Sequence, residues 1–142
     1  MSAGNPKLRA AELAVGATRE QVLVESLSRT QIVQYAGASG DFNPIHHDEV
    51  FATGSAGYPS VFAHGMLTMG LTGRLLTDWL GDGVLRSFGV RFVRQVWPGD
   101  TLTAKGTVKA ASADGRVEIE LVTTNQRGEP VVAGEAVAQL PV

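Results

Sequence analysis

Two carboxylates and two imidazoles occur together between Ser39 and Asp48, in a chain of which only 18% of the residues are charged. The segment reads SGDFNPIHHD. Asp41 and His46 stand on either side of a proline, and a turn there lets their side chains converge, whereas a strand rising about 3.3 Å per residue would separate them. A carboxylate and an imidazole that share one water form an acid–base pair, because histidine both accepts and donates a proton near neutral pH.

The same segment also has interpretations without this chemistry. GDFNP is a good turn sequence, so Asp41 alone is equally typical of an Asx turn. Asp48 is expected to cap the next helical turn, with His47 facing solvent. A metal site would need Asp41, His46, His47 and His64 as ligands, but no HxxH or HxxxH pair anchors such a set, so we expect no metal.

A second candidate group lies in FAHGM, where a long apolar segment begins. If that segment is a helix, its first N–H groups have no intrahelical partner and its N-terminus carries about half a positive charge. Gly65 then offers a backbone N–H to an oxygen that gains negative charge. The alternative is a glycine that only lets the chain turn into the core. We expect His64 to be structural, with its ring hydrogen-bonded beneath the loop.

The elements that position these groups follow from hydrophobic patterning. A strand is expected in residues 19–28 and a short helix in residues 28–40, which ends at glycine. Residues 64–81, HGMLTMGLTGRLLTDWLG, predict a helix that is apolar on nearly every side, so we place it at the centre of the domain. Residues 84–140 contain four strand-like runs, which we interpret as an antiparallel meander. The predicted class is α+β, a single domain with an antiparallel sheet wrapped around a long central helix.

Composition limits the possible partners. A chain of 142 residues, 44% of them hydrophobic, is expected to form one domain, residues 13–142, after a flexible arm at residues 1–12. A net charge of −2 offers no basic surface for nucleic acid or an anionic membrane. The absence of cysteine excludes disulfides and thiolate chemistry. No apolar run approaches the roughly 20 residues of a membrane span, so we expect a cytoplasmic protein.

Three motifs at their spacing resemble a known family. YAGASGDFNPIHHD, then FAHGMLTMG, then WPGD before a strand are similar to the MaoC-type (R)-specific enoyl-CoA hydratases and 3-hydroxyacyl dehydratases, which have a hotdog fold. The resemblance covers about residues 20–140. It implies that Asp41 and His46 are catalytic, that Asn43 supports their turn, and that the Gly65 N–H binds the thioester carbonyl as an oxyanion donor.

The resemblance also implies an activity and its partners. The reaction is water addition to trans-2-enoyl thioesters of CoA or an acyl carrier protein, giving (R)-3-hydroxyacyl thioesters, or the reverse dehydration in acyl metabolism, without a cofactor. Tyr58, Val61 and Phe62 are candidates for lining the acyl site, and ordinary core packing is the alternative role for each. Hydratases of polyester synthesis have serine where this chain has Gly73, whereas dehydratase subunits of mycolic-acid-type elongation have glycine there, as this chain does. The acyl substrate therefore stays open. A homodimer is expected, or a heterodimer with a related subunit. A hotdog thioesterase and a subunit of a heteromeric dehydratase are the alternatives.

Overall fold

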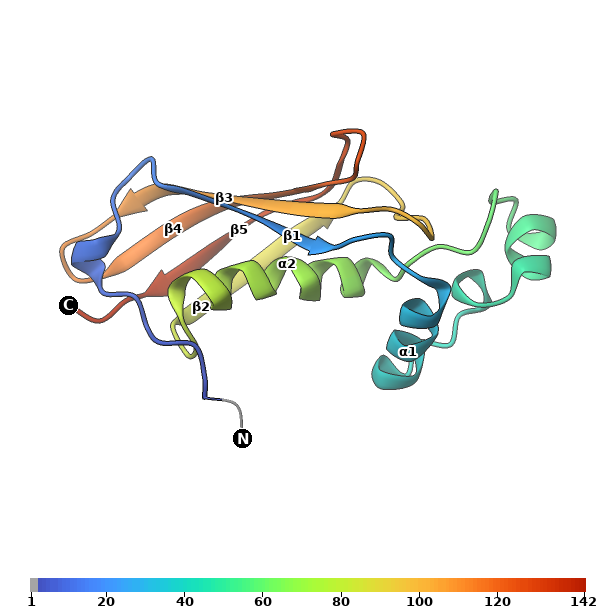
Figure 1. The fold of residues 1–142 in the computed structure, drawn as a ribbon, viewed down its shortest axis with the longest axis horizontal. Coiled ribbons are helices and arrows are strands. Elements are labelled where there is room, and N and C mark those ends of the chain that lie inside the picture. Colours follow the sequence, from blue (N-terminus) through green and yellow to red (C-terminus); the bar gives the residue numbers. More distant parts are fainter. Residues whose placement is uncertain (1–2) are drawn as a thin grey trace.

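One long helix lies along one face of a five-stranded antiparallel sheet in the computed structural model, which describes residues 3–142 (Figure 1). The helix, α2, spans Gly65–Leu80. The strands stand in the order β1-β3-β4-β5-β2. Their bounds are Thr18–Val24 for β1, Leu85–Phe92 for β2, Leu102–Ala111 for β3, Arg116–Thr124 for β4 and Pro130–Gln139 for β5. The predicted α+β class is confirmed.

The predicted meander of four consecutive strands is wrong for β2. β3, β4 and β5 do pair in sequence, but β2 pairs with β5 and β1 pairs with β3. The reason is the connection after β2, residues 93–101, which is too long for a tight hairpin turn and contains a proline. It carries the chain from the β5 edge across to the position beside β1. The alternation of apolar and polar residues predicts a strand, but it does not predict which strand pairs with it.

The core lies between α2 and the sheet. The residues of α2 that face the sheet are fully buried: Thr72, Leu75, Leu76 and Leu80. Gly106 in β3 permits the close approach, because a Cβ there would stand 2.9 Å from the Trp79 ring. Met66, however, is 55% exposed. The predicted long central helix against an antiparallel sheet is confirmed, and in a single chain the sheet covers one face of that helix.

The N-terminal segment is hydrogen-bonded to the body of the domain. The Leu8 N–H donates to Leu80 O at 2.9 Å and the Ala10 N–H donates to Pro141 O at 2.8 Å. A single 3-10 turn follows at Ala10–Glu12. Residues 1–2 of the predicted arm lie outside the described residues, and the domain boundary at residue 12 stays a prediction. Within residues 3–142, none of the helices combines the length and apolarity that crossing a membrane requires.

The candidate site belongs to the helix α1, Arg29–Ser39, and the segment between it and α2. This part contains a 3-10 turn at Pro44–His46 and a π-helical turn at Phe51–Ser55. It extends from one end of the sheet, and the C-terminus lies at the opposite end (Figure 1). An ion pair between Arg29 and Glu49 ties α1 to this segment.

Candidate active site

The end of α1 determines where the candidate site begins. Ser28 starts the helix with a capping box, in which its hydroxyl accepts from the Gln31 N–H at 3.0 Å and the Gln31 side chain accepts from the Ser28 N–H at 2.9 Å. Gly40 ends it in the left-handed conformation, with φ of 75°, where glycine costs least. Helix α1 therefore releases the chain directly before Asp41.

A chain of local hydrogen bonds then builds the turn. Asp41 Oδ1 accepts from the Asn43 N–H at 3.2 Å, and Asn43 Oδ1 accepts from the Ile45 N–H at 3.2 Å. Pro44 occupies the first position of the following 3-10 turn, where its missing N–H costs nothing. This turn places His46 Nε2 at 3.9 Å from Asp41 Oδ2. Asp41 thus makes the Asx turn with one oxygen and faces the imidazole with the other, so the predicted turn and the predicted convergence with His46 occur together.

His46 is a buried, oriented imidazole. Its side chain is 8% exposed, whereas that of Asp41 is 53% exposed. His46 Nδ1 lies 2.7 Å from Phe62 O. Because a carbonyl oxygen only accepts, Nδ1 carries the proton and Nε2 presents its lone pair toward Asp41. Burial lowers the pKa of His46, and the charges of His64 and His47 act in the same direction, against the Phe62 hydrogen bond and Asp41, which raise it.

His64 packs directly against this imidazole. The two rings stack with centroids 3.8 Å apart and planes 26° from parallel. His64 Nε2 lies 3.0 Å from Asp41 O, so the predicted hydrogen bond beneath the loop is confirmed, and the acceptor is the backbone of Asp41. His47 is exposed, as expected, with its Nε2 3.0 Å from Phe42 O. The Asp48 carboxylate accepts from the Phe51 N–H at 3.1 Å, which confirms it as a cap.

Within residues 3–142, Asp41, His46 and His64 form the group that could hold a metal ion, since one ligand atom from each lies within 4.8 Å of the others. Their orientation argues against a preformed metal site. The nitrogen lone pairs lie in the ring planes, and nearly parallel stacked rings point them side by side, whereas tetrahedral ligation needs them to converge on one point. His47 is not part of this group.

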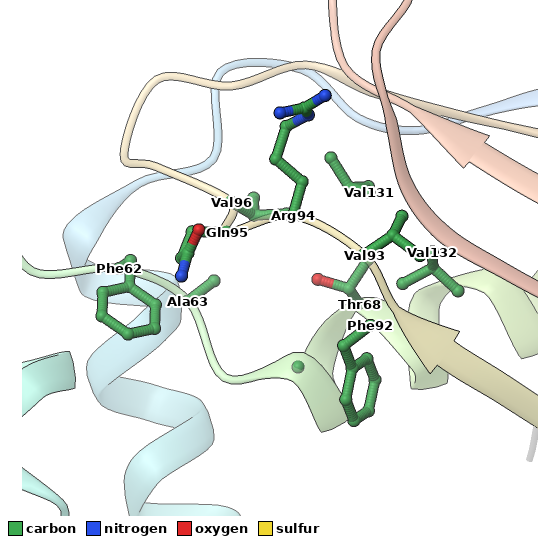
Figure 2. Close-up of a pocket in the computed structure, with 11 residues that line it drawn as sticks. Phe62, Ala63, Thr68, Phe92, Val93, Arg94, Gln95, Val96, Val131 and Val132 are labelled. Carbon is green, nitrogen blue, oxygen red and sulfur yellow. The ribbon is translucent and has the colours of Figure 1, made fainter.

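Gly65 is the first residue of α2 and follows His64 directly. Its N–H has no intrahelical partner because of its position, and the described residues offer no hydrogen bond to it. The ring of Phe92 covers the glycine: a Cβ at Gly65 would meet three of its ring carbons at 3.0–3.1 Å. Figure 2 shows this ring beside the first turn of α2. The stacking of His64 on His46 brings the acid–base pair next to the start of α2.

A cavity of about 290 Å³ opens beside Gly65. Its walls come from the strand-like segment before α2, the first turns of α2, the β2–β3 connection and β5 (Figure 2). Phe62 lines it, and the Phe62 ring also contacts His46 edge-on at 5.3 Å, so this residue contacts both the cavity and His46. Tyr58 packs on Phe62 at 4.7 Å without lining the cavity, and Val61 is buried in the core.

Sequence reasoning missed most of the cavity wall. Phe92 and the residues 93–96 that follow it lie opposite Gly65, and β5 adds Val131 and Val132. The sequence did contain a signal for this wall. Connections between strands are usually polar turns, whereas the run RFVRQVWPGD contains several apolar residues. The pairing of β2 with β5, which brings these residues together, was not predicted.

Comparisons with known proteins agree with the fold described above. The family model described as "MaoC like domain" matches residues 10–129. The chain is 31% identical over 121 residues to an (R)-specific enoyl-CoA hydratase of Rhodospirillum rubrum, covering 84% of this chain and 83% of the relative. A stretch of 68 residues is 47% identical to 3-hydroxyacyl-thioester dehydratase Y of Mycobacterium tuberculosis and covers 46% of this chain, but only 23% of that relative.

A solved structure extends the similarity to nearly the whole chain. The unliganded R-hydratase of Pseudomonas aeruginosa superposes with a TM-score of 0.85 at 30% sequence identity, covering 98% of this chain and 89% of that one. The five-stranded sheet with its helix is the hotdog fold of such proteins. Since the family model spans most of the chain, this protein belongs to the family of MaoC-like domains.

Proposed function

We propose that this protein adds water to trans-2-enoyl thioesters to form (R)-3-hydroxyacyl thioesters, or catalyses the reverse dehydration. The observation that carries the proposal is a pair of acceptors, Asp41 Oδ2 and His46 Nε2, 3.9 Å apart and with no proton between them. The names of the relatives, a hydratase and a dehydratase, support the same reaction class.

Two acceptors at this separation orient one water. A water at about 2.8 Å from each atom spans the gap and donates one hydrogen to the carboxylate and one to the imidazole. Its lone pairs then face away from both residues, toward the β carbon of an enoyl group. As the oxygen bonds to that carbon, one of the two acceptors takes a proton from the water. The lowered pKa keeps His46 unprotonated, as a base must be.

The electrons of the carbon–carbon double bond move toward the thioester oxygen in this step. The free Gly65 N–H and the positive end of the 16-residue helix α2 would stabilise that oxygen as an enolate. When the enolate collapses, the acid–base pair donates the proton that it accepted from the water to the α carbon. The sum is one water added across the double bond, with the pair returned to its starting state.

The cavity beside Gly65 suits the acyl group of the substrate. Its lining includes the apolar residues Phe62, Phe92, Val96, Val131 and Val132. The polar residue Thr68 also lines it. An acyl chain placed there would leave its thioester next to Gly65, which forms part of the same wall. Among the three sequence-predicted lining residues, we therefore keep Phe62 as the acyl contact and assign Tyr58 to its support.

We also propose that the working form is a homodimer. The exposed Met66 on α2 and the unpaired edges of β1 and β2 are surfaces that a second hotdog chain would cover. A related chain in place of an identical one is the alternative. Light scattering after gel filtration measures the mass of the purified protein and distinguishes the two. A monomer of 14.9 kDa that becomes active only when a related subunit is added would exclude the homodimer.

The experiment that tests the function is a hydration assay on the purified chain with crotonyl-CoA and longer trans-2-enoyl-CoAs. The expected result is loss of enoyl absorbance, with an (R) product by chiral analysis. A thiol reagent run in parallel detects a thioesterase. Release of free thiol without loss of the enoyl group, or a pure (S) product, would contradict the proposal.

A further inference from the structure

His64 is the residue at the candidate site whose contacts the proposed mechanism leaves unused. It is 2% exposed and stands at the N-cap of α2 without making a side-chain cap. Its ring lies between Tyr35, which contacts it edge-on at 4.9 Å, and His46, on which it stacks at 3.8 Å. A polar ring so deeply buried normally has hydrogen bonds for both nitrogens, because an unpaired one costs about 1–3 kcal/mol.

Among the residues that the structure describes, only one nitrogen of His64 has a hydrogen-bond partner. Nε2 lies 3.0 Å from Asp41 O, which only accepts, so Nε2 carries the proton in the neutral ring. Nδ1 then holds the lone pair, and the part of the chain that the structure describes offers it no hydrogen-bond partner. A side chain chosen for stability alone would avoid this cost. The cost instead accompanies two contacts with the acid–base pair, one to the backbone of Asp41 and one to the ring of His46.

We propose that His64 is a positioning residue of this site, which holds the main chain at Asp41 through Nε2–H and sets the plane of the His46 ring by stacking on it. The inference rests on the proposed function. Asp41 is half exposed, and within residues 3–142 its Oδ2 makes no hydrogen bond, so the position of this carboxylate depends on the Asp41 backbone. The Phe62 carbonyl fixes the proton of His46, but a single hydrogen bond leaves the ring free to tilt about it.

The stack also affects proton transfer. The titratable groups around His46 are His64, Asp41 and His47; His64 and His47 lower its pKa and Asp41 raises it. Removing the imidazole of His64 therefore takes away one influence that favours the unprotonated base. A residue with a purely structural role at this place would affect folding, without moving the titration of His46.

Two substitutions separate the two contacts. His64→Phe keeps an aromatic ring against His46 and removes the donor to Asp41 O, whereas His64→Gln keeps a side-chain N–H donor and removes the ring. We expect His64→Phe to lower kcat by about 100-fold, the effect of misplacing a catalytic group by roughly 1 Å. His64→Gln should recover part of that loss. Both should move the acid limb of kcat/KM to higher pH. His47→Gln is the comparison variant: it removes the other histidine that lowers the pKa of His46 but leaves both contacts of His64 in place, so it should move the acid limb without the loss of kcat.

A second readout does not depend on activity. The chain has three histidines, so ¹⁵N-labelled imidazoles give few signals. In the unmodified protein we expect His64 to be protonated at Nε2 and His46 at Nδ1, and the His46 titration midpoint to rise in both His64 variants. If the tautomers are reversed, or the His46 midpoint and kcat are unchanged in folded His64→Phe, the proposal is overturned. An inactive but folded wild-type protein with the expected tautomers would instead refute the proposed function alone.

Discussion

Replacing Gly65 with proline removes one backbone N–H from the candidate site and leaves the helix that carries it intact. Gly65 is the first residue of α2, where the N–H makes no intrahelical hydrogen bond and where proline is favoured. His64 has φ of −62° and ψ of 133°, an extended conformation that a following proline permits. If the Gly65 N–H binds the enolate oxygen, its loss should impair catalysis without unfolding the protein.

The magnitude follows from the role of the lost group. Removal of one oxyanion donor costs about 100- to 1,000-fold in kcat, or about 2.7–4 kcal/mol of transition-state stabilisation. The new side chain also meets the Phe92 ring at 3.0–3.1 Å. Phe92 is 53% exposed, so its ring has room to move by the few tenths of an ångström required. Proline also restricts the unfolded chain, which should raise the free energy of unfolding by about 0.4–1 kcal/mol and offset the cost of that contact.

Gly65→Ala is the matched control, because it introduces the same Cβ against Phe92 and keeps the N–H. Hydration of crotonyl-CoA should fall by two to three orders of magnitude in Gly65→Pro relative to Gly65→Ala. Thermal unfolding should show similar melting temperatures for the two variants. Equal kcat in the two proteins would refute the assignment of the Gly65 N–H as the oxyanion donor.

Four further predictions test the rest of the site and the stability of the fold. Asp41→Asn keeps an oxygen for the turn but loses the carboxylate, so the rate of hydration should fall by about 100- to 10,000-fold. Asp48→Asn, at a cap in the same loop, should retain the rate of the unmodified protein. Burial lowers the pKa of His46, and its unprotonated form is the base, so kcat/KM should fall only on the acid side, with a midpoint below about 6.5; a midpoint above that value would contradict the buried base. Gly106→Ala places a Cβ 2.9 Å from the α2 tryptophan and should lower the free energy of unfolding by about 1–3 kcal/mol in urea titration. Gly37→Ala, in open space on α1, should raise it by about 0.5–1 kcal/mol.

Local features of this site are encoded in short stretches of the sequence. The cap at Ser28, the glycine that ends α1 and the turn around Asn43 and Pro44 all depend on hydrogen bonds between residues at most four apart. Such contacts form wherever the chain goes next. For this reason the convergence of Asp41 and His46 followed from residue types and spacing alone.

Tertiary structure decided what surrounds that pair. The strand order, with β2 beside β5, depends on how the nine residues after β2 cross the sheet. The alternation of apolar and polar residues cannot determine this order, because it does not distinguish one strand from another. Phe92 reaches Gly65 from 27 positions away because β2 packs against α2. His64 reaches His46 from 18 positions away because the segment between α1 and α2 folds back on itself, with hydrogen bonds from the two histidines to Phe62 O and Asp41 O. Contacts between distant segments require the whole core to close, so no short pattern in the sequence contains them.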